Sequence, residues 1–214
     1  QWLLARRRFH SRGLPQARRT VSASLAVLAG SRRSCLTAGV STALPYKIST
    51  LLYCFNRQDE VLLLERTKEP NRGLWSPCGG KLQMDTGESP YACACREAQE
   101  EIGRAVQTSD LHLTGLVSEH GYEGQAHWLL FLFEVKPRLE TLPAPISEGR
   151  FQFFERAQID ALRLPQTDRE QIWPLFWRHR GGFFAAHCHC HDDGRHDWTL
   201  EETLSHDALE NRQS

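Results

Sequence analysis

The segment from Gly79 to Gly103 constrains this chain more than any other, because it gathers four glutamates and an arginine around one loop and one short helix. The residues at its ends predict the helix. Ser89 is a favourable N-cap, Pro90 suits the first helical position, and Gly103 can adopt the left-handed conformation that ends a helix. No other stretch combines so much charge with such regular spacing.

The predicted helix has two faces of opposite character. At about 100° per residue, one narrow arc is apolar and is predicted to be buried; it comprises Tyr91, Cys95, Ala98 and Ile102. Glu97, Glu100 and Glu101, spaced i, i+3 and i+4, share another arc on the far side.

Three carboxylates this close repel one another, and the repulsion raises carboxyl pKa values unless a cation lies among them. A divalent ion removes the conflict, and ligands that are all oxygen favour Mg²⁺, or else Mn²⁺, over zinc. The competing interpretation is a solvated acidic helix face, which an isolated Glu-x-x-Glu-Glu pattern usually is. The neighbouring glycines and Arg96 favour the metal site.

Together these residues resemble the Nudix box, a family pattern in which a glycine loop precedes a helix with Arg-Glu and Glu-Glu pairs. The helical half matches well: Glu88, seven intervening residues, Arg96-Glu97, Ala98, Glu100-Glu101 and Gly103. The loop half departs from the pattern, since seven residues separate Gly80 from Glu88, two more than in the family. We expect this insertion, near Asp85-Thr86, to bulge outward without moving the helix. Arg104 also stands where the family has an aliphatic residue.

The resemblance implies the roles of the site residues. Glu100 and Glu101 would bind the metal, and Glu97 would be either a ligand or the base that takes a proton from water. Arg96 and Glu88 would orient the loop against the helix. The implied catalytic residues are Glu97, Glu100, Glu101, Arg96 and Glu88.

The Gly79 carbonyl would be a further ligand, and a carboxylate from a later loop is common in this family. Glu148, just before the apolar run at Phe151, is the candidate, with Glu119 and Glu123 as alternatives. The implied metal ligands are therefore Glu97, Glu100, Glu101, Gly79 and Glu148.

The implied activity is divalent-metal-dependent hydrolysis of a nucleoside diphosphate linked to another group X. Phosphoryl transfer depends on positioning and charge neutralisation, which metal ions supply. The compact size and the Gly-Gly-Lys-Leu opening of the loop favour a nucleoside triphosphate pyrophosphatase of the 8-oxo-dGTP diphosphatase type. An ADP-ribose or other nucleotide-sugar pyrophosphatase is the alternative, and a non-catalytic nucleotide-binding module is the alternative class.

The implied fold is α/β, a Nudix α/β/α sandwich with a mixed β-sheet. Apolar runs rich in β-branched and aromatic residues predict strands at 46–55, 61–67, 111–119, 126–135 and 150–154, and helices are predicted at 157–162 and 169–178. Pro174 is expected to divide the last helix, and Trp75 is expected in the core. We predict a Nudix hydrolase domain over 46–180 and extensions over 1–45 and 181–214.

Residues 1–45 differ from the rest, because they hold eight arginines and no Asp or Glu precedes Asp59. This composition resembles an organellar transit peptide, and a translated upstream region fits equally; disorder is expected in either case. We expect a cytoplasmic protein, or an imported one if the segment is a genuine transit sequence. The formal net charge of +0 argues against long nucleic acid, and no apolar run is long enough to span a membrane. The expected partner is a small nucleotide, and a homodimer is left open.

The tail carries a second dense pattern, His187-Cys188-His189-Cys190-His191. Cysteine and histidine suit zinc or copper, but alternation along a strand sends the two residue types to opposite sides. A β-hairpin with its turn at 192–195 is therefore predicted in preference to a metal site. The seven cysteines, an odd number, do not predict a disulfide framework.

Overall fold

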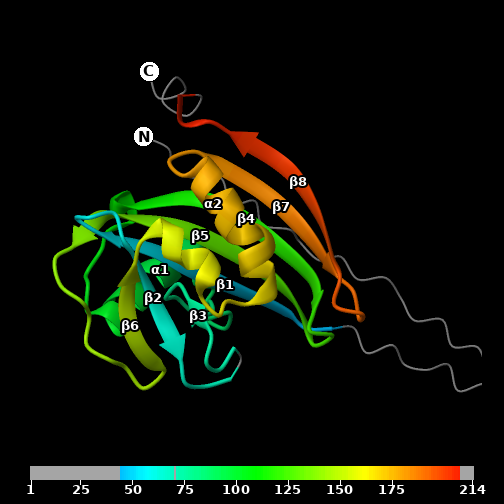
Figure 1. Cartoon of the computed structure of the whole chain (residues 1–214), viewed down its shortest axis with the longest axis horizontal. Coiled ribbons are helices and arrows are strands. Elements are labelled where there is room, and N and C mark those ends of the chain that lie inside the picture. The colour runs from blue at the N-terminus through cyan, green and yellow to red at the C-terminus, as the bar shows by residue number, and fades with distance from the viewer. Residues whose placement is uncertain (1–43, 70, 208–214) are drawn as a thin grey trace, which may run out of the picture. The chain divides into compact units, whose positions relative to one another are not determined.

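An eight-stranded mixed sheet organises the residues that the computed structural model describes, which are 44–69 and 71–207 (Figure 1). The strands are β1 (Tyr46–Asn56), β2 (Val61–Arg66), β3 (Trp75–Ser76), β4 (Leu111–Tyr122), β5 (Ala126–Leu139), β6 (Gly149–Phe154), β7 (Phe183–Cys190) and β8 (His196–Leu204). Their order is β3-β2-β1-β5-β4-β7-β8, and β6 pairs with β2. The pairs β1–β5 and β4–β7 are parallel and the others antiparallel, which confirms the predicted mixed sheet.

Two helices cover opposite faces of this sheet, α1 (Pro90–Ile102) and α2 (Trp173–His179). Ala98 of α1 packs in one apolar cluster with Leu52 of β1. Phe176 of α2 stacks on Tyr53, the next residue of β1, with ring centroids 3.8 Å apart. Because successive side chains of a strand point to opposite faces, the sheet lies between the helices. The predicted α/β/α architecture is confirmed.

Shorter helical turns connect these elements. They are the 3₁₀ helices η1 (Thr108–Asp110) and η2 (Arg156–Ala161) and the π-helix η3 (Asp168–Ile172), which runs directly into α2. Pro174 stands in the first turn of α2, where its missing N–H is tolerated. Residues 166–179 are nonetheless helical without a break, so the prediction that Pro174 divides this helix was wrong; only the hydrogen-bonding pattern changes, from π in η3 to α in α2.

The buried side of α1 differs from the predicted arc. Its buried residues are Cys93, Ala94, Glu97 and Ala98. Of the predicted arc, Tyr91 is 37% exposed, and Cys95 and Ile102 are only half-buried. The prediction was right only in part: Ala98 is buried and Cys95 and Ile102 pack against the core, but the most buried face is turned toward Cys93 and Ala94. The reason is that α1 packs on the glycine loop as well as on the sheet: the Cys93 thiol lies 3.6 Å from the Gly80 carbonyl oxygen.

The tail forms the outer part of the sheet, since β7 pairs with β4 and β8 pairs with β7. Cys188 and Cys190 are buried, whereas His187 is half-buried and His189 is exposed. The predicted alternation of the two residue types is confirmed. The domain boundaries stay predictions, and residues 1–43 lie outside the described part of the chain.

Within the described residues, no helix is long and apolar enough to cross a membrane. Trp75 is 8% exposed and belongs to the core on the α2 face, as predicted.

Candidate active site

The glycine loop is held against β1 by an extension of the sheet. The backbone N–H groups of Thr50 and Leu52 donate to the carbonyl oxygens of Gly80 and Cys78 at 2.9 and 2.8 Å. Because residues 78 and 80 bond to β1, Gly79 between them faces the other way. Its N–H donates to Oε2 of Glu101 on α1 at 2.8 Å. The loop is therefore fixed to the sheet on one side and to the helix on the other.

Both glycines are required by these close approaches. Gly79 has φ of 136°, and a Cβ there would lie 2.1 Å from the Thr50 carbonyl oxygen. A Cβ on Gly80 would lie 2.1 Å from Oε1 of Glu97. A side chain at either position would displace β1 or the Glu97 carboxylate.

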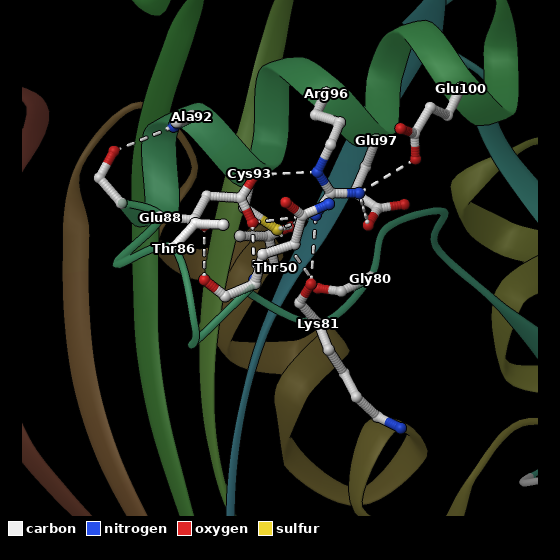
Figure 2. A network of polar contacts seen from close by, with 12 residues as sticks. Thr50, Gly80, Lys81, Thr86, Glu88, Ala92, Cys93, Arg96, Glu97 and Glu100 are labelled. Carbon is white, nitrogen blue, oxygen red and sulfur yellow. Dashed lines mark hydrogen bonds and ion pairs between the residues drawn. The ribbon is translucent and has the colours of Figure 1, made fainter.

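Arg96 ties the loop to the helix (Figure 2). Its Nε and Nη2 donate to the two carboxylate oxygens of Glu88 at 2.8 and 3.0 Å, a bidentate pair. Nη1 donates to Glu97 at 2.6 Å and to Glu100 at 3.0 Å, and Nη2 also reaches the Lys81 carbonyl oxygen at 3.2 Å. One guanidinium thus contacts three of the four glutamates.

The two extra residues of the loop lie within an exposed turn that spans residues 83–87. The Gln83 N–H donates to Oε2 of Glu88 at 2.8 Å, and the Glu88 N–H donates to the Gln83 carbonyl oxygen at 3.2 Å. The turn is closed at its base, so Glu88 still reaches Arg96. The expected outward bulge is confirmed.

The glutamates of this site differ in acidity. Hydrogen bonds from Arg96 lower the pKa of Glu88 to about 2, although burial opposes the shift. Burial raises the pKa of Glu101 to about 7; the Gly79 N–H opposes the rise, and the charges of Glu97 and Glu148 add to it. Burial also raises the pKa of Glu97, against the lowering effect of Arg96. The raised values mark carboxylates that lack sufficient positive charge.

These residues fit a hard divalent ion by their chemistry, because every donor is oxygen and a cation would relieve the crowding around Glu101. In the described ranges, however, no three His, Cys, Asp or Glu side chains are already arranged as metal ligands. Arg96 spans Glu97 and Glu100. Arg96 engages only Oε1 of Glu97 and Oε2 of Glu100, so the second oxygen of each carboxylate is not bonded to the guanidinium.

A cavity of about 550 Å³ opens beside the carboxylates, within the usual range for small-molecule sites. Its lining includes Gly79, Gly80, Glu97, Glu100, Glu101 and Glu148. Glu148 lies 3.6 Å from Arg66, and it is near enough to raise the pKa of Glu101. The alternatives Glu119 and Glu123 also line the cavity, but neither is among the charges that shift Glu101.

A second pair of acids, Glu119 and Asp168, lines the same cavity. Sequence reasoning named Glu119 only as an alternative metal ligand and missed Asp168 and Thr167. An acid at an inward position of an apolar strand was a usable signal for Glu119. No comparable signal in the sequence marked Asp168, because this residue is buried only through the π-helix that begins at it.

Carboxylates on one helix face, held by an arginine beside a cavity of this size, are suited to the hydrolysis of phosphoanhydride bonds. The chain belongs to the Nudix family, since the model of the NUDIX domain matches residues 45–176, more than half of the sequence. It is therefore a Nudix hydrolase, an enzyme of a family that acts on small nucleotides and generally uses divalent metals.

Solved structures agree with this assignment. A MutT mutator protein from Bacillus halodurans is 25% identical, with a TM-score of 0.57 over 72% of this chain and 97% of that one. A MutT protein from Methanosarcina mazei Go1 is 23% identical, with a TM-score of 0.54 over 65% of this chain and 96% of that one. The NUDIX domain of NrtR from Shewanella oneidensis, complexed with ADP ribose, is 17% identical, with a TM-score of 0.51 over 64% and 88%. The last two similarities show the fold alone.

Proposed function

We propose that this hydrolase is a nucleoside triphosphate pyrophosphatase of the 8-oxo-dGTP diphosphatase type. The observation that carries the proposal is the composition of the cavity. The carboxylates around α1 line one part of it, and Trp128, Tyr122 and buried polar groups line another. A ligand with phosphates at one end and an aromatic base at the other suits this lining. The similarity to the Bacillus halodurans mutator protein supports the same choice.

Mg²⁺ is the proposed ion, with Mn²⁺ as the alternative, and its proposed ligands are Glu97, Glu100, Glu101, Glu148 and the Gly79 carbonyl. Such an ion supplies positive charge against the diphosphate and makes water a better nucleophile. Glu97 is a ligand or the base that takes the water proton, and burial raises the pKa of its carboxyl, which makes it a stronger base. Arg96 and Glu88 keep the loop and α1 in register.

Two lysines of the cavity provide charge for the phosphates. Lys47 and Lys81 both line it, with ammonium groups 5.1 and 5.9 Å from the ring centroid of Trp128. Figure 2 shows the Lys81 side chain extending away from α1. A phosphate between these lysines and a divalent ion held by the α1 carboxylates would have positive charge on two sides.

Two alternatives remain. ADP-ribose or another nucleotide sugar would also contact a diphosphate site, and ADP ribose is the ligand named for the NrtR domain. A non-catalytic nucleotide-binding module would keep the fold but not the turnover. We further propose a free nucleotide as partner rather than long nucleic acid, because the formal net charge is +0. A cytoplasmic location and a homodimer stay predictions.

A substrate screen tests the proposal. The full chain is assayed with Mg²⁺ against nucleoside triphosphates, 8-oxo-dGTP, ADP-ribose, nucleotide sugars and dinucleoside polyphosphates. We expect triphosphates to be hydrolysed to a nucleoside monophosphate and pyrophosphate faster than the other classes are hydrolysed at their phosphoanhydride bonds. Equal and slow turnover of all classes contradicts the proposed substrate, and no turnover supports the non-catalytic alternative.

A further inference from the structure

Half of the ten histidines of the chain lie together at one end of the sheet; they are His120, His127, His187, His189 and His191. Glu119 of β4 and Trp128 of β5 line the active-site cavity. The histidines next to them in sequence therefore point to the other face of these strands. His189 of β7 is the register partner of His120 and shares this face. The β4–β5 and β7–β8 turns lie at the same end of the sheet (Figure 1). Histidines of three strands thus share a surface that is separate from the cavity.

The rings of these histidines form a continuous row. Ring centroids lie 4.6 Å apart for His127 and His120, and again for His120 and His189. The rings of His189 and His191 follow, with centroids 4.4 Å apart. Two imidazoles bound to one tetrahedral Zn²⁺ through nitrogens at about 2.0–2.1 Å have ring centroids about 5 Å apart. The spacing of the row is therefore close to that of imidazoles that share one ion.

A β-bulge in β4 orients His120. The register of β4 and β5 shifts after Glu119, where two residues of β4, His120 and Gly121, oppose one residue of β5. Gly121 has φ of 73°, and its N–H donates to Nδ1 of His127 at 3.0 Å. Because Nδ1 accepts this bond, the proton of the neutral His127 ring is on Nε2. His127 therefore supports the row by stacking, and its neighbours are the better metal ligands.

Those neighbours keep ring nitrogens available for a ligand. In the described part of the chain, neither His120 nor His189 has a ring nitrogen hydrogen-bonded to another residue. Nε2 of His191 donates to Oδ2 of Asp197 at 2.6 Å, since a carboxylate can only accept. Nδ1 of the neutral His191 ring then carries a lone pair. A carboxylate on the far nitrogen is the usual support of a metal-binding histidine, because it fixes the tautomer and makes the ligand more basic.

We propose that His120, His189 and His191 bind one transition-metal ion, with Zn²⁺ as the best fit, and that Asp197 positions His191. Imidazole nitrogens suit zinc, copper and nickel, whereas Mg²⁺ prefers oxygen. This site and the carboxylates of α1 therefore select different ions. Three protein nitrogens leave a fourth position for water. The ion links β4 to β7 and so fixes the C-terminal hairpin to the rest of the sheet.

Binding requires rotation of side chains only. The rings are stacked rather than turned toward one point, and in residues 44–69 and 71–207 no three side chains already form a ligand group. His120 and His189 are exposed, and exposed side chains change rotamer within picoseconds to nanoseconds. The backbone already holds the two residues at paired positions of β4 and β7. The strands therefore need not move when the ion binds.

The competing donors are two thiols on the opposite face of β7. Cys188 and Cys190 are buried, and their sulfur atoms lie 3.7 Å apart. Alternation along the strand keeps them away from the histidine row. Soft ions bind thiolates, so a zinc titration must separate the two faces.

The test measures Zn²⁺ binding to the full chain without an affinity tag, by competition with a chromophoric chelator in excess Mg²⁺. The Mg²⁺ is present to saturate the carboxylates of α1. We expect His120→Gln and His189→Gln each to lower the affinity for zinc about 100-fold, and Asp197→Asn to lower it about 10-fold. The matched control is His206→Gln, which changes an exposed histidine beyond the other end of β8 and is expected to bind zinc as the unchanged protein does.

Melting curves give a second measurement. At a zinc concentration 100 times the Kd, the unchanged protein is expected to melt about 5–10 °C higher than without zinc, and His120→Gln and His189→Gln lose this shift. Both variants change exposed side chains, and their melts without zinc check that they fold. An affinity for zinc that neither variant lowers overturns the inference. A loss in Cys190→Ala with none in the histidine variants places the ion at the thiols and overturns it too. Nucleotide hydrolysis enters neither measurement, so the outcome is independent of the proposed function.

Discussion

Two groups of acids line one cavity, and their environments give them opposite properties. Around α1, Arg96 donates to three carboxylates, and the pKa of Glu88 falls to about 2. Across the sheet, Asp168 has no Lys or Arg among the described groups that shift its pKa, which rises to about 8. The residue type is nearly the same in both places. Counter-charge and burial decide whether an acid stays ionised or retains a proton near neutrality.

The largest effect is expected for Glu101→Gln. Glu101 belongs to the α1 group, but burial raises its pKa to about 7, between the values for Glu88 and Asp168. The substitution keeps the shape of the side chain and its acceptor for the Gly79 N–H, but it removes a proposed ligand charge. The kcat/KM for the best triphosphate is expected to fall about 10³-fold, with fold and melting temperature retained. The loss of kcat/KM is measured as pyrophosphate release at a fixed Mg²⁺ concentration.

Glu201→Gln on β8 is the matched control for that prediction, because it makes the same chemical change on an exposed strand. It is expected to turn over substrate at the unchanged rate. If Glu101→Gln does so too, the α1 group does not carry the chemistry and the proposed mechanism is wrong.

The next largest effect is on stability, in Glu88→Gln. A depressed pKa stabilises the folded state above the pKa of the unfolded chain, and this stability is lost as pH falls through the folded value. Near neutral pH the variant is expected to be about 2 kcal/mol less stable in denaturant unfolding. The difference should shrink between about pH 5 and about pH 2.

Glu140→Gln is the control for Glu88→Gln, since Glu140 pairs with Arg57 at the surface and both side chains are more than half exposed. It is expected to change stability by less than about 0.5 kcal/mol. A difference for Glu88→Gln that does not depend on pH would mean that Arg96 does not hold this carboxylate ionised.

Asp168→Asn is predicted to act in the opposite direction. A raised carboxyl pKa means that the folded state binds the extra proton, so its stability falls as pH rises from the unfolded value through about 8. The variant removes this loss and is expected to melt higher than the unchanged protein at about pH 9, with little difference near pH 4. Melting curves over this range measure the gain. If the gain in melting temperature were the same at every pH, the pKa of Asp168 would not be raised on folding, and its ionised form would have to be solvated.

The smallest effect is expected from deleting Asp85 and Thr86. The turn that contains them is exposed and closed at its base by Gln83 and Glu88. Activity should change by less than about threefold, because the deletion restores a five-residue spacing without touching Arg96. A loss as large as that of Glu101→Gln would show that the insertion positions the glycine loop.

Much of this site could be predicted from short-range pattern. The caps of α1, the spacing of its glutamates and the exposed insertion depend on residues close in sequence, and all were predicted. The buried side of α1 was predicted only in part, and Cys93 was missed because the loop that covers it reaches it by pairing with β1. The spacing of residues along a helix does not show that the glycine loop forms a second surface against which the helix packs.

The sequence by itself determined the family, the carboxylates of α1 and the positions of most strands, because these follow from local spacing and from alternation along the chain. Only the tertiary structure decided the order of the strands in the sheet, the contacts of Arg96 with three glutamates, the effect of the Glu148 charge on Glu101, and the burial of Asp168. Glu119 and Asp168 lie far apart in sequence. Burial raises both of their pKa values, and the charge of Glu119 raises that of Asp168 further, so these shifts arise only when the strands and the π-helix pack together.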